Sequence, residues 1–272
     1  MGKIIEKNYD VAARINKQIV VLSDIHYYSK KDLKKLNKIL EKVKLLNPDY
    51  ICIPGDLTDE AIINDEDDLI TWLKELSSIC MVIIGMGNHD LFITKKHIPK
   101  INHELIKKIK NIRNVKYLDN EIYSVDKINF IGLTLPLEYY YSSNEDSKLF
   151  IDYVNKNFKE LDDNYNILLC HSPVCIGKKE VLNQLKIGKK LDLVLSGHMH
   201  GGITPNFLKK ILRGIGLISP RRKLFEKNCY GFKKIDNTYY VISSGVTVAS
   251  HINSFLALDI FFSSEVSVIN FR

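Results

Sequence analysis

Short apolar runs that alternate with helix-spaced apolar residues are the feature that most restricts the fold of this chain. Runs of strand length occupy residues 17–23, 49–54 and 80–85, and apolar residues recur at helical spacing from Leu33 to Val43. Strands that alternate with helices in this way are typical of an α/β architecture. Short β runs in residues 230–271 predict that further strands build a second sheet.

The chain shows no internal repeat and no low-complexity linker, so we predict a single domain over residues 1–272. Its apolar stretches are far shorter than the ~20 residues of a membrane-spanning helix. The N-terminus has no apolar signal core, and the five cysteines form no Cys-x-x-Cys pair, which favours reduced thiols. These features predict a cytoplasmic protein.

Polar residues that can bind metal ions follow the apolar runs. They are Asp24 and His26, Asp56 and Asp59, Asn88 and His89, His171, and His198 and His200. Because ligands of open α/β sheets gather outside the carboxyl ends of the strands, we expect these side chains at one rim of the sheet. Each motif alone has an ordinary explanation as a polar turn, but their joint occurrence favours a functional site.

The combination of carboxylate, amide and imidazole groups suits borderline divalent metals better than calcium or magnesium alone. Asp56 offers two oxygens and is a candidate bridge between two ions. Two metal ions roughly 3.5–4 Å apart activate a water molecule and clamp the oxygens of a phosphoryl group. The residue types therefore indicate metal-dependent chemistry at phosphorus.

In chain order, the motifs resemble those of the calcineurin-like metallophosphoesterase superfamily. They are Asp24-x-His26, Gly55-Asp56-x-x-Asp59, Gly87-Asn88-His89-Asp90, His171 and Gly197-His198-x-His200. The resemblance implies two facing mixed β-sheets flanked by helices, an α/β/β/α sandwich. The segments around Asp24 and His200 look most like the bacterial membrane-associated branch, which includes hydrolases of lipid-linked and nucleotide-sugar phosphates.

The resemblance also implies a role for each residue. One metal site would consist of Asp24, His26, Asp56 and His200, and the other of Asp56, Asn88, His171 and His198. The cofactors would be two divalent ions, with Mn, Fe or Zn preferred. His89 matches the histidine that contacts phosphate and protonates the leaving oxygen, and Asp59 matches the position that supports this histidine.

The predicted function is a dinuclear metal-dependent hydrolase of phosphate esters or pyrophosphates, in which metal-activated water attacks phosphorus. The expected partner is a phosphorylated small molecule or a lipid-linked substrate. Two alternatives stay open: a metal-binding scaffold of the same fold without turnover, and a nuclease. Nucleic acid is not the expected partner, because no aromatic stacking platform accompanies the basic residues.

The net charge of +7 is unevenly distributed. Residues 209–234 carry nine lysines and arginines against one acid, Glu226, and residues 203–234 are predicted to form a basic loop insertion. Apolar residues interleave with its first basic residues, as in segments that lie on anionic membranes. A solvated loop, contact with an anionic membrane at the inner face, and contact with substrate are the three interpretations.

Three consecutive tyrosines, Tyr139 to Tyr141, follow Pro136 in a long connection between strand and helix. Binding residues often lie on such loops. The tyrosines are therefore a candidate cap over the metal rim, with packing on the protein surface as the other interpretation.

Overall fold

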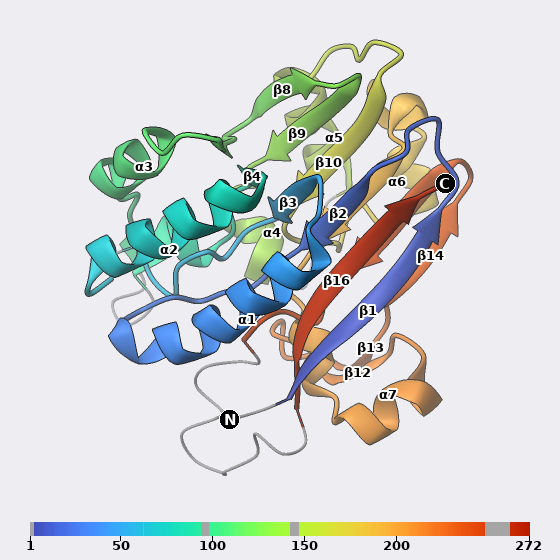
Figure 1. Ribbon diagram of the computed structural model, residues 1–272. Coiled ribbons are helices and arrows are strands. Elements are labelled where there is room, and N and C mark those ends of the chain that lie inside the picture. Colours follow the sequence, from blue (N-terminus) through green and yellow to red (C-terminus); the bar gives the residue numbers. More distant parts are fainter. Residues whose placement is uncertain (1–2, 62, 94–97, 142–146, 248–261) are drawn as a thin grey trace.

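Two six-stranded sheets pack face to face, and helices cover their outer faces (Figure 1). The computed structural model describes residues 3–61, 63–93, 98–141, 147–247 and 262–272. Both sheets contain parallel and antiparallel neighbours. The predicted sandwich of two mixed sheets between helices is confirmed.

The first sheet has the strand order β1-β16-β2-β3-β4-β7. Its strands are β1 (Ile4–Val11), β16 (Ser264–Phe271), β2 (Gln18–Val21), β3 (Tyr50–Ile53), β4 (Met81–Ile84) and β7 (Val115–Tyr117). All neighbours are parallel except β16 and β2, which are antiparallel. The strands β2, β3 and β4 therefore end at the same edge of the sheet, where β16 begins.

The second sheet has the strand order β14-β15-β11-β10-β9-β8. Its strands are β14 (Gly231–Ile235), β15 (Thr238–Ile242), β11 (Leu193–Ser196), β10 (Tyr165–Cys170), β9 (Ile128–Leu133) and β8 (Glu121–Val125). The inner strands are parallel, and antiparallel β14 and β8 close the two edges. Two short ribbons accompany the sheets: β5 (Phe92–Ile93) with β6 (Ile98–Pro99), and β12 (Gly216–Ile218) with β13 (Leu224–Glu226).

The helices are α1 (Leu33–Leu46), α2 (Glu66–Ile79), α3 (His103–Lys110), α4 (Glu138–Tyr141), α5 (Ser147–Asn157), α6 (Lys179–Leu182) and α7 (Asn206–Leu212). Those that pack on the sheets form the outer layers (Figure 1). Side chains of α1, α2 and α3 pack on the first sheet, and those of α5 and α6 pack on the second. Within the ranges that the structure describes, no helix could cross a bilayer.

Residues of the central strands alternate between the two sides of each sheet. In β3, Cys52 faces the core between the sheets, whereas Ile51 and Ile53 face the helical layer. In β10, Leu169 faces the inner core and Leu168 faces the helices. Both faces are buried, so each strand reads as a continuous apolar run, and each side chain contributes roughly 1.5–3 kcal/mol to stability.

Two features differ from the sequence-based expectations. β1 was not predicted, because it is an edge strand whose polar and apolar residues are mostly half-buried. The basic segment at residues 203–234 is not a loop, because it contains α7, the β12–β13 ribbon and most of β14. Its strands are too short to give a clear β pattern, and Ser219 closes the ribbon by backbone hydrogen bonds to Arg222 and Lys223.

Candidate metal centre

The carboxyl ends of strands from both sheets bring the predicted metal-binding residues together. Asp24 and His26 follow β2, Asp56 follows β3, Asn88 follows β4, His171 follows β10, and His198 and His200 follow β11. All of them are buried. The predicted residues therefore lie at one rim, and strands of both sheets contribute to it.

Several of these residues have an unusual backbone conformation. Asp24, His26, Asp56, His198 and His200 have positive φ angles between 46° and 67°. Residues other than glycine rarely adopt this region, at a cost of roughly 1–3 kcal/mol each. Hydrogen bonds between different turns hold these conformations. The His26 N–H donates to the Asp56 carbonyl (3.1 Å), and the His198 N–H donates to Asp24 Oδ1 (2.9 Å). Strain at five positions that were predicted to bind metal indicates a functional site.

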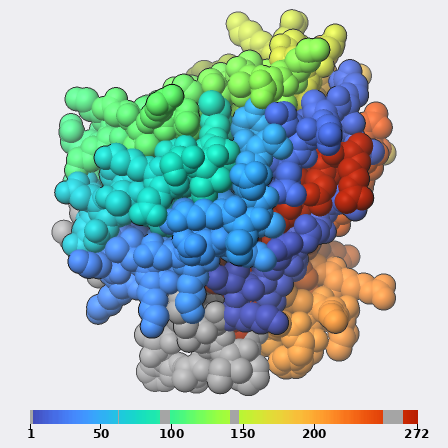
Figure 2. Space-filling view, in the orientation of Figure 1, coloured from blue at the N-terminus to red at the C-terminus, as the bar shows by residue number. Residues whose placement is uncertain are grey.

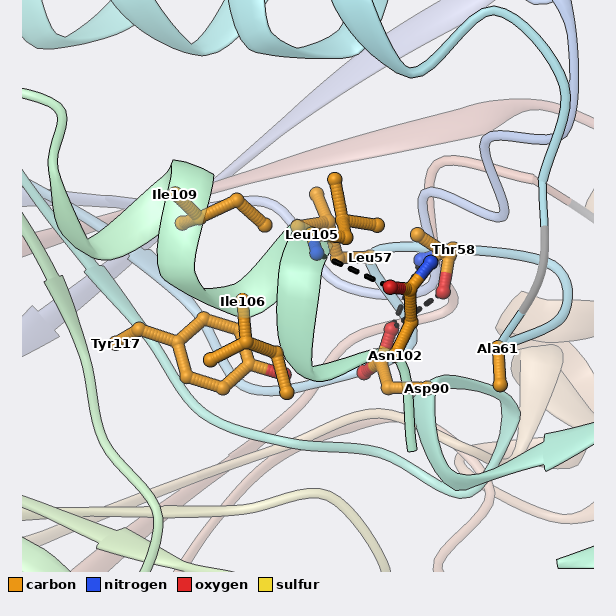
Figure 3. Close-up of a pocket in the computed structure, with 9 residues that line it drawn as sticks. All are labelled: Leu57, Thr58, Ala61, Asp90, Asn102, Leu105, Ile106, Ile109 and Tyr117. Carbon is orange, nitrogen blue, oxygen red and sulfur yellow. Dashed lines mark hydrogen bonds between the residues drawn. The ribbon is translucent and has the colours of Figure 1, made fainter. Parts of the chain in front are cut away.

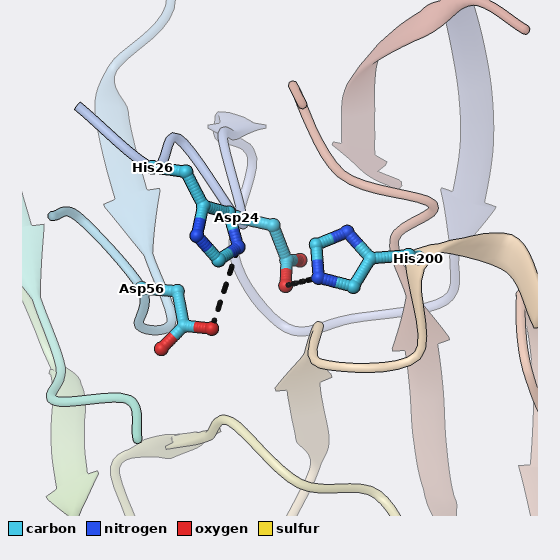
Figure 4. Close-up of side chains that lie close together, drawn as sticks. All are labelled: Asp24, His26, Asp56 and His200. Carbon is cyan, nitrogen blue, oxygen red and sulfur yellow. Dashed lines mark ion pairs between the residues drawn. The ribbon is translucent and has the colours of Figure 1, made fainter. Parts of the chain in front are cut away.

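The first ligand group contains Asp24, His26, Asp56 and His200 (Figure 4). One candidate ligand atom from each lies within 4.8 Å of the others. His26 Nε2 lies 3.5 Å from Asp56 Oδ2, and His200 Nε2 lies 3.6 Å from Asp24 Oδ1. The resemblance assigned these residues to one metal site, and the structure gathers them around one point.

The second ligand group contains Asp56, His171 and His198, again with candidate ligand atoms within 4.8 Å of one another. His171 Nε2 lies 2.9 Å from Asp56 Oδ2. Asn88, the predicted fourth ligand, is buried beside His89, whose N–H donates to Asp56 Oδ1 (2.9 Å). Asp56 belongs to both groups, as is expected of a carboxylate that could bridge two ions.

Contacts to Nδ1 fix the ring orientation of two histidines of the first group. His26 Nδ1 lies 3.0 Å from Asp59 Oδ1, and His200 Nδ1 lies 2.9 Å from the carbonyl of Thr247. Both contacts leave Nε2 directed at the buried carboxylates. Partners of this kind select the ring tautomer and orient a metal-binding histidine.

The tyrosine segment lies directly against the second group. Tyr140 is fully buried in α4, its carbonyl lies 3.2 Å from His198 Nε2, and its ring centroid lies 5.2 Å from that of His198. Because this contact occupies Nε2, Nδ1 is the ring nitrogen of His198 that is available to a metal ion. A backbone carbonyl carries this contact, so no side-chain pattern in the sequence could have indicated it.

His89 and Asp59 lie beside the first group, and Asp59 contacts His89 through its backbone carbonyl rather than its carboxylate. The Asp59 carbonyl lies 2.6 Å from His89 Nδ1, whereas the Asp59 carboxylate is 4.0 Å from that nitrogen and closer to His26. His26, Asp59 and His89 are close enough to suggest a third metal group. Because Asp59 already occupies Nδ1 of both histidines, we interpret them as a hydrogen-bonded cluster.

Asp90 holds the turn that carries Asn88 and His89. Its Oδ1 accepts hydrogen bonds from the N–H and the hydroxyl of Thr58, both at 2.9 Å (Figure 3). Its Oδ2 accepts the Gly87 N–H at 2.9 Å. Asp90 thus ties the turn after β4 to the turn after β3, and so positions His89 relative to Asp56.

The electrostatics of Asp56 and His171 are those of a close ion pair. Burial opposes the charge on Asp56, but His171, His89 and His26 outweigh burial and hold its pKa well below the ordinary value. Burial likewise lowers the pKa of His171, but the Asp56 carboxylate overcomes this and raises it to about 9. Asp56 is therefore ionised at neutral pH.

His198 and His200 remain neutral. Burial, with the charge of His171, lowers the pKa of His198 to about 3, and burial also lowers the pKa of His200. Neutral imidazole is the form that binds metal ions. The rim therefore offers ionised carboxylate and neutral imidazole at adjacent positions.

A divalent cation fits this donor set. Asp24 and Asp56 are fully buried, and neither forms an ion pair with a lysine or arginine in the part of the chain that the structure describes. The buried His26 Nε2 has no hydrogen-bond partner there. Buried carboxylates need a compensating charge, and oxygen and imidazole nitrogen ligands together suit a borderline divalent metal.

Comparison with known proteins agrees with this arrangement. The family model for calcineurin-like phosphoesterases matches residues 17–202, which include all the predicted site residues. An uncharacterised metallophosphoesterase of Campylobacter jejuni is 31% identical over 79% of this chain and 54% of its own length. One of Helicobacter pylori is 30% identical over 68% of this chain and 45% of its own. The chain thus spans about half the length of the curated relatives it matches.

The fold also occurs among solved structures. The crystal structure of TT1561 from Thermus thermophilus matches with a TM-score of 0.50 and 15% identity, over 85% of this chain and 90% of that one. This likeness concerns the fold, whereas the family model covers the sequence of the rim itself. On that match, the chain belongs to the calcineurin-like phosphoesterase family.

Proposed function

We propose that the chain is a dinuclear metal-dependent hydrolase of phosphate esters or pyrophosphates. The observation that carries the proposal is the pair of ligand groups that share Asp56, with His89 beside them. Mn, Fe and Zn are the ions that suit these ligands best. The relatives are about twice as long as the matched region, so the activity of the whole protein is part of the same proposal.

The two ligand groups support an assignment of the ions to residues. Asp24, His26 and His200 would hold one ion, His171 and His198 would hold the other, and Asp56 would contact both. The family resemblance adds Asn88 to the second set. When bound, a pair of divalent ions stabilises charge on phosphoryl oxygens and lowers the pKa of water. The ionised carboxylate of Asp56 and the neutral imidazoles of His198 and His200 would supply ligands of the form that metal ions need.

His89 supplies the proton for the leaving group in this proposal. Its side chain is 18% exposed, whereas those of His26, His171 and His200 are 3%, 0% and 8% exposed, so among these rim histidines His89 is the most open to a substrate. The Asp59 carbonyl engages Nδ1 and leaves Nε2 to donate a proton to the leaving oxygen. This arrangement is that of a general acid.

The proposed substrate is a phosphorylated small molecule or a lipid-linked phosphate or pyrophosphate. The net charge of +7 favours such anionic substrates. With a lipid-linked substrate, the protein would work at the inner membrane face as a peripheral protein.

Turnover assays with Mn²⁺, Fe²⁺ or Zn²⁺ test the proposal on phosphomonoesters, phosphodiesters and pyrophosphates. We expect metal-dependent release of product from at least one class, and its loss in Asp56→Asn. Metal binding without turnover of any class would support the scaffold alternative. Preferred degradation of RNA or DNA would support the nuclease alternative.

A further inference from the structure

The helix and the ribbon that follow the metal rim expose large apolar side chains. Phe207 and Ile211 in α7 are 64% and 73% exposed, and Leu224 and Phe225 in the ribbon are 68% and 63% exposed. Phe207 and Ile211 are four residues apart, so they lie on one face of α7. An exposed apolar cluster of this kind marks an interaction surface rather than ordinary solvent contact.

The same segment also carries exposed basic residues. Lys210, Arg213, Arg222 and Lys227 are exposed. The segment's one acid, Glu226, is occupied by an ion pair with the buried Arg221 at 2.9 Å. The surface is therefore cationic as well as apolar, which is the combination found in segments that lie on anionic membranes.

A cavity lies next to the same surface. It has a volume of about 300 Å³, and Arg213, Lys227 and Tyr230 are among the residues that line it. The cationic residues Arg213, Lys227 and Lys233 line the cavity together with Tyr230, and such a lining suits a phosphate group with an attached organic part.

The surface is fixed to the metal rim. Asn206 Nδ2 donates to Ser263 Oγ (2.8 Å) at the start of β16, and Lys209 Nζ donates to Ser244 Oγ (3.0 Å) after β15. Gly202, two residues after His200, packs so closely on Gly216 of β12 that a Cβ on Gly202 would lie 2.1 Å from the Gly216 Cα. In Figures 1 and 2, α7 and the orange atoms of this region lie at the lower margin of the molecule.

We propose that α7 and the β12–β13 ribbon form a docking surface for an anionic lipid bilayer. Phe207, Ile211, Leu224 and Phe225 enter the interface, and the exposed lysines and arginines contact anionic headgroups. Charge complementarity favours this occupant. Anionic headgroups would pair with the exposed lysines and arginines of the segment, which a neutral protein surface would not do. The docking is separate from hydrolysis and needs no turnover to be observed.

Vesicle sedimentation of the full chain tests the proposal. Wild type should sediment with phosphatidylcholine vesicles that contain phosphatidylglycerol, much less with phosphatidylcholine alone, and less as salt increases. Lys210→Glu with Arg213→Glu, and separately Phe207→Ser with Ile211→Ser, should each weaken binding at least about tenfold. The matched charge control is Lys159→Glu with Lys189→Glu, at exposed positions on the chain segments that lead into β10 and β11. The apolar control is Leu45→Ser, whose side chain is 85% exposed in α1.

Circular dichroism verifies that the variants are folded, so that a loss of vesicle binding can be attributed to the substituted surface residues. Equal sedimentation with neutral and anionic vesicles, or none with either, would overturn the proposal. So would control variants that lose as much binding as the surface variants. Light scattering tests the alternative that a second copy of the chain occupies this surface. If wild type dimerises and Phe207→Ser with Ile211→Ser is monomeric, the second copy occupies the surface and the membrane proposal is wrong.

Discussion

The carboxylate of Asp59 lies 3.0 Å from Nδ1 of His26. The backbone carbonyl of the same residue lies 2.6 Å from Nδ1 of His89, whereas its carboxylate is 4.0 Å from that nitrogen. One residue thus orients the proposed metal ligand His26 with its side chain and contacts the proposed proton donor His89 with its backbone. The two roles can be separated by mutation, because a substitution at Asp59 removes the carboxylate and keeps the carbonyl.

Asp59→Ala should weaken metal binding by roughly 10–100-fold, the usual effect of removing a group that orients a metal ligand. At saturating metal, kcat should stay close to wild type, since the carbonyl contact to His89 remains. Calorimetric metal titration and assays over a range of Mn²⁺ concentrations measure the two effects. Unchanged metal affinity with a large loss of kcat would show that the carboxylate acts on His89.

Asp56→Asn should lower the metal content from two ions per chain toward one or fewer, because Asp56 belongs to both ligand groups. Elemental analysis after metal loading and desalting measures the stoichiometry. Asp67→Asn is the matched control, since the Asp67 side chain is 96% exposed on α2. Two ions retained in Asp56→Asn would contradict the bridging role.

His89→Ala should lower kcat by roughly 10²–10⁴-fold, the scale of general acid catalysis. Metal content should not change, because both ligand groups that share Asp56 lack His89. The loss should shrink for aryl phosphates with good leaving groups, which need little protonation. His103→Ala at an exposed position on α3 serves as the control. Loss of metal together with activity would make His89 a ligand.

Gly197→Ala should disturb the rim, because its Cβ would lie 1.8 Å from Ser23 Oγ and 2.3 Å from Asp24 Oδ2. We expect a loss of about 1–3 kcal/mol in the free energy of unfolding, as for other overpacked sites, and a lower metal content. Urea denaturation and elemental analysis measure both. Gly85→Ala is a milder control, since its nearest contact would be 3.3 Å from Leu169 Cβ. Equal stability of the two variants would contradict the steric argument.

The stability difference between Lys209→Met and wild type should depend on pH. Burial lowers the pKa of Lys209 to about 8, although Glu265 opposes the shift, whereas an unfolded lysine titrates near ~10.4. Below pH ~8 the folded protein therefore carries a charging penalty of about 3 kcal/mol, which fades as the pH rises toward ~10.4. Any stability that Lys209→Met gains at pH ~7 should decline over that range.

Urea denaturation of both proteins at several pH values measures this difference. Lys210→Met provides the comparison, because Lys210 is exposed on the same helix. A pH-independent difference for Lys209→Met, equal to that of Lys210→Met, would show that Lys209 is not charged at a cost in the folded protein.

The sequence by itself determined the layered α/β architecture and the residues that gather at the rim. Strands with two buried faces are continuous apolar runs, so β2, β3, β4, β10 and β11 could be recognised locally. Residues that directly follow parallel strands must lie at one edge of a sheet. For that reason Asp24, Asp56 and Asn88, which follow β2, β3 and β4, could be expected together from their positions in the chain. His171, by contrast, follows β10 and reaches them because the second sheet packs on the first.

Only the tertiary structure decided how the rim residues are oriented. The partners of His198 and His200 are backbone carbonyls of Tyr140 and Thr247, and a carbonyl has no sequence signature. Asp59 could be assigned to His89 or His26 only after the turns following β2, β3 and β4 were placed beside one another. The same holds for α7 and the β12–β13 ribbon, whose short elements are stabilised by contacts with Ser244, Ser263 and Gly202 rather than by local propensity.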